Sequence, residues 1–330
     1  MRKQYATGLV VCAVLGFLAA PAGAKSQITE FDPPGSTLTY AVAINDASEC
    51  VGLYADSSGI SHGFFRTSDG TITSFDPPGS SGTEALGINQ SGVITGPYAD
   101  SSAIWHGFLR ASDGTFTTFD PSGSTGTFPR AINDHGAITG LFADSNNVLH
   151  GFLRSPSGNI TTFDPQGSTT TGAYSINSKG VITGYYADSS GVSHGYVRKA
   201  NGKITTFDPQ GSLDTIAFGI NKAGVIAGEF ADNGDVHGYV RASNGTFMVF
   251  DPPGSRNTES MSINNKGTVS GYYNVGTGVK GFERKPGGSI ATFAVKFAIY
   301  TFGFAINDND VIAGSFMDDS NVYHGLIRTP

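Results

Sequence analysis

Six histidines, spaced 43 or 44 residues apart except for one gap, are the first residues in this chain that could do chemistry. They are His62, His106, His150, His194, His237 and His324, and Lys280 takes the place that falls in the gap. Imidazole can bind metals or transfer protons, but a metal centre needs its ligands within about 2.0–2.1 Å of one ion. Side chains on successive copies of a repeat cannot converge in that way. We therefore expect structural hydrogen-bonding histidines, and neither a metal nor a cofactor.

Charged residues recur with the same period. The arginines are Arg66, Arg110, Arg154, Arg198, Arg241, Arg284 and Arg328, and the aspartates are Asp56, Asp100, Asp144, Asp188, Asp232 and Asp318. A reaction that needs one acid and one base does not need so many copies of each, so we expect ion pairs between these two sets. The Ala-Asp-Ser-Ser-Gly loops could also hold calcium through oxygen ligands. Calcium is the weaker hypothesis, because most loops supply one carboxylate and no glutamate closes them.

An Ile-Asn dipeptide marks the repeat that must position these residues. Its asparagines are Asn45, Asn89, Asn133, Asn177, Asn221, Asn264 and Asn307, with spacings of 44, 44, 44, 44, 43 and 43 residues. Each copy holds four short runs rich in Val, Ile, Thr, Tyr and Phe, separated by Gly, Asn, Asp and Pro, a pattern typical of strands and turns. Antiparallel meanders stacked around an axis cover both of their faces. We therefore predict an all-β fold, a seven-bladed β-propeller of four-stranded antiparallel blades; a linear β-solenoid would need shorter repeats.

The phrase Phe-Asp-Pro-Pro-Gly-Ser predicts how this ring closes. It occurs at 31–36, 75–80 and 250–255, and near copies occur at 119–124, 163–168 and 207–212, whereas 293–298 has the sequence Phe-Ala-Val-Lys-Phe-Ala. Proline fixes φ and glycine allows a positive φ, so the phrase ends an outer strand in a turn. The chain begins with such a fourth strand and ends, at 324–330, with a third strand. We expect the N-terminal strand to complete the last blade, which removes the exposed sheet edges.

The N-terminal residues predict a signal peptide. A basic start at residues 2–3 precedes a short apolar run over 9–20, and Ala22-Gly23-Ala24 resembles a cleavage site. The apolar run is shorter than the roughly 20 residues that span a bilayer. We expect cleavage after Ala24, a secreted or periplasmic protein without a membrane span, and a single propeller domain over residues 25–330.

Composition limits the partners. The chain has 20 Lys plus Arg against 27 Asp plus Glu, a net charge of −7, and it has no basic run. Neutralisation of phosphates by Lys and Arg supplies most of the affinity for nucleic acid, so we expect no nucleic-acid partner, and we expect a monomer. Cys50 would be the one cysteine left after processing, and we interpret it as a small buried side chain.

The cycle of His-Gly-Phe, Phe-Asp-Pro-Pro-Gly-Ser and Ile-Asn phrases resembles the bacterial extracellular HAF-repeat family, named for a His-Ala-Phe phrase. Examples here are His62-Gly63-Phe64 and His106-Gly107-Phe108, while His194-Gly195-Tyr196 carries tyrosine. The exchange of glycine for alanine departs from the family pattern. The resemblance covers nearly all of the mature chain and implies an exported bacterial repeat protein, but it carries over no catalytic residues.

If the recurring residues build the ring, the function should lie where the copies differ. The variable positions cluster at the end of the ring that holds the loop between the second and third strands and the entry to the first. The candidate ligand-binding residues there are Tyr40, Glu84, Trp105, Phe128, Glu259, Phe302 and Tyr323. Aromatic rings and carboxylates around a shallow mouth suit a carbohydrate or a peptide, although ordinary packing substitutions would give the same pattern.

Three hypotheses follow. The leading one is a non-catalytic binding or interaction module for a glycan or another surface ligand. The alternative is a carbohydrate-active enzyme, a glycoside hydrolase or polysaccharide lyase, with Glu84 and Glu259 as acid and base; glycoside hydrolysis needs carboxyls about 5–9.5 Å apart, which opposite sides of a channel mouth would exceed. The third is a purely structural envelope or matrix protein that binds no small ligand.

Overall fold

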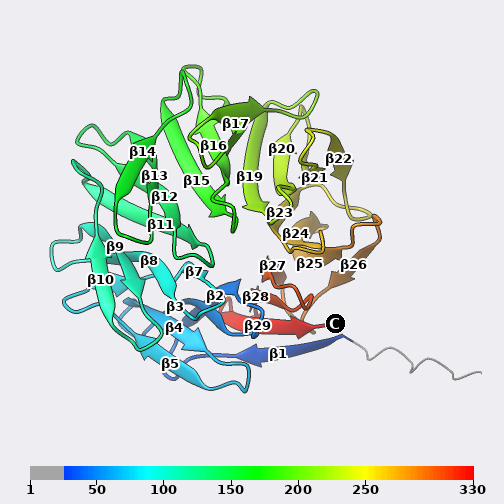
Figure 1. The fold of residues 1–330 in the computed structure, drawn as a ribbon. Helices are drawn as coiled ribbons and strands as arrows, with labels where there is room; N and C mark the ends of the chain where they lie inside the picture. The colour runs from blue at the N-terminus through cyan, green and yellow to red at the C-terminus, as the bar shows by residue number, and fades with distance from the viewer. Residues whose placement is uncertain (1–25) are drawn as a thin grey trace, which may run out of the picture.

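The computed structural model describes residues 26–330, so the predicted signal peptide lies outside the described residues. Every helix or strand in this range is a β-strand, and no helix in it is long and apolar enough to cross a membrane. The strands form sheets around a common axis, with the first strand of each repeat nearest to that axis (Figure 1). We call these first strands the inner strands, and we number the repeats 1 to 7 by their asparagines, from Asn45 to Asn307.

Repeats 1 to 5 form one antiparallel sheet each. Four of these sheets have four strands: β2 (Leu38–Ile44), β3 (Cys50–Ala55), β4 (Ser61–Arg66) and β5 (Ile72–Phe75); β11 (Gly126–Ile132), β12 (Ile138–Ala143), β13 (Leu149–Arg154) and β14 (Ile160–Phe163); β15 (Thr170–Ile176), β16 (Ile182–Ala187), β17 (Ser193–Arg198) and β18 (Ile204–Phe207); β19 (Asp214–Ile220), β20 (Ile226–Ala231), β21 (Val236–Arg241) and β22 (Phe247–Phe250). In repeat 2 the inner strand is divided into two pieces: β6 (Gly82–Thr83) and β7 (Gly87–Ile88), beside β8 (Ile94–Ala99), β9 (Trp105–Arg110) and β10 (Phe116–Phe119).

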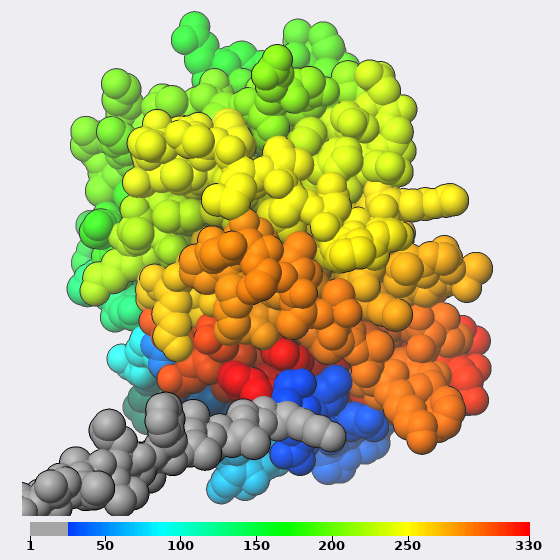
Figure 2. Space-filling view, turned by 90° about the vertical axis from the view of Figure 1, so that its right-hand side faces the viewer, coloured from blue at the N-terminus to red at the C-terminus, as the bar shows by residue number. Residues whose placement is uncertain are grey.

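The remaining strands form one eight-stranded sheet. They are β23 (Thr258–Ile263), β24 (Val269–Val275), β25 (Gly278–Arg284), β26 (Ile290–Phe293), β27 (Tyr300–Ile306), β28 (Ile312–Met317), β29 (Tyr323–Thr329) and β1 (Gln27–Phe31). A single parallel bridge between Val279 and Tyr300 joins repeat 6 to repeat 7. The N-terminal strand β1 pairs antiparallel with β29, from Gln27 opposite Thr329 to Phe31 opposite Gly325, which is the strand pair expected from the offset of the repeat. Figure 2 shows the N-terminal residues in blue against the C-terminal residues in red.

The recurring asparagine joins each repeat to the next. The Nδ2 of Asn45 donates to the backbone oxygen of Asn89, and the same bond repeats around the axis until Asn307 donates to Asn45, with lengths of 2.9–3.3 Å. In most repeats the Oδ1 atom also accepts backbone amides of the turn that follows, as Asn89 Oδ1 does from Ser91 and Val93. The Ile-Asn dipeptide is therefore a connector between repeats and also caps its own turn.

The aspartate of the Phe-Asp-Pro phrase explains why that phrase recurs. In six repeats this aspartate accepts a hydrogen bond of 2.6–2.8 Å from Nδ1 of the repeat histidine. Asp32 and Asp251 also accept from Thr39 and Thr258 of the next inner strand, each at 2.6 Å. The histidine Nε2 lies 3.3–3.6 Å from the aspartate of the Ala-Asp loop. One aspartate thus joins its own third strand to the following repeat.

Repeat 6 lacks all three members of this cluster. Lys280 replaces the histidine, Ala294 replaces the aspartate of the Phe-Asp-Pro phrase, and Val275 replaces the loop aspartate. Thr301 of the next inner strand then accepts a hydrogen bond from the Val295 amide instead, at 3.1 Å. Because the three residues are absent together, the cluster behaves as one unit of the fold.

The expected ion pairs between arginines and loop aspartates are wrong. Each arginine lies instead over the phenylalanine of the preceding repeat's outer strand, with 4.5–5.1 Å between Cζ and the ring centroid. The strand register gives the reason: Arg66 pairs with Cys50 at one end of β4, whereas Asp56 follows Ala55, which pairs with Ser61 at the other end. Cation–π packing between repeats is therefore the role of these arginines.

Candidate binding site in the axial channel

A bulge in the inner strand directs one extra side chain from each repeat into the axial channel. In β2 the pairing shifts between Ala41 and Ala43, which leaves Val42 outside the ladder. The strands come so close there that a Cβ on Gly52 would lie 1.8 Å from the carbonyl oxygen of Tyr40. The equivalent residues line a cavity of about 360 Å³: Val42, Leu86, Arg130, Tyr174, Phe218, Met261 and Phe304. They differ from repeat to repeat, so the channel is chemically asymmetric.

Aromatic rings gather at the end of the channel where the inner strands begin, which we call the entry end. Tyr40 lies 5.0 Å from Tyr323 between ring centroids, and Phe302 lies 6.3 Å from Tyr323. Phe302 stacks on Phe304 at 5.6 Å with an interplanar angle of 9°, and Tyr272 meets Phe302 edge-on at 4.9 Å. We call Tyr40, Tyr272, Phe302, Phe304 and Tyr323 the aromatic patch. Burial, with a contribution from Tyr323, raises the pKa of Tyr40 to about 12.

The structure brings four of the seven residues predicted from the sequence together. Tyr40, Phe302 and Tyr323 belong to the aromatic patch, and Glu259 joins it because the Tyr272 hydroxyl donates a hydrogen bond to the Glu259 carboxylate. Burial raises the pKa of Glu259, while that hydrogen bond opposes the shift.

The other three predicted residues lie elsewhere around the channel. Trp105 and Phe128 form a separate pair, with ring centroids 6.1 Å apart. Glu84 lies within the electrostatic reach of Arg130: burial raises the pKa of Glu84 and the guanidinium opposes it. Arg130 itself lies over the ring of Tyr174, at 5.8 Å from the centroid.

Glu229 is a buried acidic residue near Glu259 that sequence reasoning missed. It lies on the second strand of repeat 5, opposite Ile216 of the inner strand, and its Oε2 is buried without a hydrogen-bond partner among the described residues. Burial and the nearby Glu259 carboxylate together raise the pKa of Glu229 to about 8. A signal was available, because the corresponding position holds Leu53 in repeat 1 and Leu141 in repeat 3.

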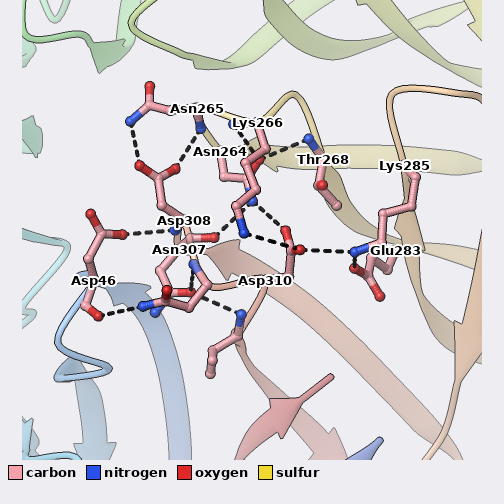
Figure 3. A network of polar contacts seen from close by, with 12 residues as sticks. Asp46, Asn264, Asn265, Lys266, Thr268, Glu283, Lys285, Asn307, Asp308 and Asp310 are labelled. Atoms are coloured by element: carbon pink, nitrogen blue, oxygen red, sulfur yellow. Dashed lines mark hydrogen bonds and ion pairs between the residues drawn. The ribbon is translucent and has the colours of Figure 1, made fainter. Parts of the chain in front are cut away.

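The opposite end of the channel is a polar hollow of about 710 Å³, lined by the Ile-Asn dipeptides and the residues after them. Its polar groups are largely used between repeats (Figure 3). The Asp308 amide donates to Asp46 Oδ1 at 2.8 Å, and the Asn265 amide donates to Asp308 Oδ1 at 2.7 Å. Close by, Lys285 Nζ lies 3.0 Å from an oxygen of Asp310. This end joins the repeats, so the entry end is the better candidate for binding.

Neither a metal centre nor a reactive thiol is found in the described part of the chain. Within residues 26–330 there is no group of three or more His, Cys, Asp or Glu side chains that could hold a metal ion. Cys50 is fully buried, and burial raises the pKa of its thiol to about 12, against an opposing effect of Arg66. A thiol held protonated in this way is a poor nucleophile.

No protein-family model matches this chain, and no curated protein does. Several solved structures are similar to it in fold. A catalytically inactive virginiamycin B lyase from Staphylococcus aureus with quinupristin is 13% identical with a TM-score of 0.65, over 93% of this chain and 100% of that one. The β-propeller domain of the Trilobed protease from Pyrococcus furiosus is 9% identical with a TM-score of 0.65, over 88% and 95%. YCF48 bound to D1 peptide is 10% identical with a TM-score of 0.55, over 92% and 94%. At these identities the likeness concerns the fold alone, which is that of a β-propeller.

Proposed function

We propose that this chain is an exported β-propeller of seven blades that binds a glycan or another surface ligand, without catalysis, at the entry end of its axial channel. The blade count and the closed ring are supported by three features: the seven asparagine bonds that return to Asn45, the pairing of β1 with β29, and an arginine over a phenylalanine at every junction between repeats. Strand β1 would then be the closing strand of the last blade.

The aromatic patch beside Glu259 is the observation that carries the binding function. Sugar rings and apolar side chains pack on aromatic faces, and a few polar groups then fix orientation. Tyr40, Phe302 and Tyr323 remain partly exposed, so a ligand can reach them. The patch is made by residues that differ between repeats, so the fold does not require it.

Export and family membership rest on the sequence. The basic start, apolar run and Ala22-Gly23-Ala24 segment support a cleaved signal peptide, and the repeat phrases support a relationship to the HAF-repeat family. The mass of the protein recovered from the producing cells tests the first point: a mature chain that begins at Lys25 supports export, and an intact N-terminus in a cytoplasmic fraction contradicts it.

Native affinity electrophoresis tests the binding function. The mature protein is run through gels that contain different soluble polysaccharides, beside Phe302→Ala and Trp105→Ala. Phe297→Ala is the matched control, because Phe297 is an aromatic side chain that is 82% exposed outside the aromatic patch. We expect selective retardation that Phe302→Ala loses and Phe297→Ala keeps. Loss in Trp105→Ala alone would move the site to the Trp105–Phe128 pair.

Normal mobility in every gel would contradict the glycan function. It would favour either a protein ligand or the third hypothesis, a structural protein of the envelope or matrix. Chemical cross-linking of the mature protein in the intact producing cell separates these two, because only a ligand-binding protein would lose its cross-linked partner when Phe302 is replaced.

A carbohydrate-active enzyme is the second candidate, and one observation favours it. Burial and the nearby Glu259 carboxylate raise the pKa of Glu229 to about 8, which would keep a general acid protonated near neutral pH. This pair replaces the Glu84–Glu259 pair considered from the sequence. Assays for new reducing ends and for unsaturated sugar products, with Glu229→Gln as the control, distinguish hydrolase, lyase and binding module.

A further inference from the structure

Two acidic groups, Glu229 and Glu259, have no cationic partner among the described residues. No ion pair is formed by Glu229 or Glu259, and Oε2 of Glu229 makes no hydrogen bond. A carboxylate that is taken out of water without a partner destabilises the folded protein. The available cation is Arg130, whose guanidinium lies over Tyr174 and interacts with Glu84.

The fold does not require an acid at position 229. In repeats 1 and 3 the same position holds Leu53 and Leu141, each opposite the corresponding inner-strand residue. Leucine therefore fits this place in the sheet. An unpaired carboxyl that the fold could replace by leucine points to a ligand that supplies the missing charge.

Aromatic rings lie around Glu229 and Glu259. The Tyr272 hydroxyl bonds Glu259, and the Tyr272 ring lies 6.1 Å from Phe304 at the cavity wall. Tyr174, whose electrostatic environment includes Glu229, stacks on Phe218 at 5.6 Å with an angle of 10°. The negative faces of aromatic rings attract cations, and they do so most strongly where water is excluded. Tyr174, Phe218 and Phe304 also line the cavity of about 360 Å³, which gives room for a ligand beside these rings.

We infer that the ligand of the entry end carries a protonated amine, held between the carboxylates of Glu229 and Glu259 and the aromatic patch. Within the glycan class this describes an amino sugar with a free amine, such as the units of a deacetylated hexosamine polymer. The inference rests on the proposed function, because it names the ligand class of the same site. The same unpaired acids would not select a neutral sugar, and they would repel an acidic one.

Isothermal titration calorimetry with a matched set of probes tests this. The mature protein is titrated with a glucosamine tetramer, an N-acetylglucosamine tetramer of the same length, and spermidine, an amine that is not a sugar. We expect the free-amine tetramer to bind and the acetylated one to bind at least about tenfold more weakly. Glu229→Gln keeps the shape of the side chain and should lower the affinity for the free-amine tetramer by roughly ten- to a hundredfold. Glu30→Gln, on the exposed face of β1, should change nothing.

The outcomes separate this inference from the proposed function. Equal binding of both tetramers, unaffected by Glu229→Gln, overturns the amine and leaves glycan binding standing. Binding of spermidine without either tetramer supports the amine and removes the glycan. If neither the free-amine tetramer nor spermidine binds, the inference is wrong.

Proton release gives a second readout that a merely structural Glu229 would not produce. A bound cation favours the ionised carboxyl, so the binding heat should depend on the ionisation heat of the buffer near neutral pH and should lose that dependence in Glu229→Gln. The titratable groups that face Glu229 are Glu259, Tyr272, Tyr174 and Tyr239. The three tyrosines have pKa values raised by burial and stay protonated throughout this range, so the released proton reports on the carboxyl pair.

Discussion

Replacing Glu229 by leucine should stabilise the protein and remove ligand binding at the same time. The change takes away a carboxyl whose Oε2 is buried and has no hydrogen-bond partner within residues 26–330, and it introduces the residue that repeats 1 and 3 carry as Leu53 and Leu141. An acid that serves function in a position that suits leucine lowers the stability of the protein in exchange for activity. The same substitution at a structural acid would destabilise instead.

The magnitude follows from the pKa of Glu229, which is about 8 in the folded protein against its usual value of 4.5. An acid whose pKa is higher in the folded than in the unfolded protein binds more protons when folded. The free energy of unfolding therefore falls as the pH rises between these two pKa values. At about 1.4 kcal/mol per pH unit, the destabilisation reaches about 3 kcal/mol at pH 7, the upper end of the roughly 1–3 kcal/mol for an unsatisfied buried polar group. With an unfolding entropy of roughly 2 cal/mol/K per residue, removing this destabilisation by Glu229→Leu raises the Tm by about 2–5 °C.

Differential scanning calorimetry at a series of pH values measures this. The difference in Tm between Glu229→Leu and the unchanged protein should be small near pH 5 and should grow up to about pH 8. Glu30→Gln is the control for loss of an acidic residue and should show no such trend. A difference that does not depend on pH, or a less stable Glu229→Leu, would refute the idea that this carboxyl is buried without a partner.

Three further predictions concern the ring. Burial lowers the pKa of each of the six repeat histidines, but the hydrogen bonds and charges of the two flanking aspartates outweigh it and the net pKa is raised. Their contribution to stability is present below pH 6.5 and is lost as the pH rises through the raised values, so the Tm should fall between about pH 6 and pH 8; a flat or rising Tm would contradict this. Deleting residues 25–36 removes β1 and the partner of His324, and thermal melting should show destabilisation of the whole ring, which two separate transitions would argue against. Restoring the missing cluster in repeat 6, by Lys280→His with Ala294→Asp and Val275→Asp, should raise stability by about 1 kcal/mol in chemical unfolding, with Lys280→His alone as the control that gains little.

The repeat period made the strands and the closing pair predictable. A spacing of 44 residues with four strand-like runs leaves few ways to cover both faces of a meander, and the missing fourth strand after 324–330 identifies β1 as its replacement. The partners of the recurring side chains were harder to predict. Arginines and aspartates that recur with one period suggested ion pairs between the two sets, but antiparallel pairing puts Arg66 at one end of β4 and Asp56 beside the other end.

The candidate site was predictable in part, because comparing the repeats shows which positions vary. Tyr40, Phe302 and Tyr323 were found because the inner-strand entry and the loop before the third strand vary between repeats, and they do meet. Glu229 was not found, because an otherwise apolar second strand indicates a buried strand, and the one signal was an acid where repeats 1 and 3 carry Leu53 and Leu141. The position of Glu229 near Glu259 of the next repeat depends on how the two repeats pack, which the sequence of one strand does not indicate.

The division between recurring and differing residues is the physical basis of the functional argument. The recurring asparagines and arginines have partners in a neighbouring repeat, and the Phe-Asp-Pro aspartates have one in the histidine of their own blade. Selection for the ring alone accounts for these residues. Among the described residues Glu229 lacks such a partner, and it stands where other repeats carry apolar, aromatic or small residues. Glu259 has no cationic partner, although the Tyr272 hydroxyl donates a hydrogen bond to it. The fold gains nothing from a buried carboxyl whose pKa is raised by burial and by the neighbouring Glu259, so a molecule that binds at the entry end is the simplest reason for its presence.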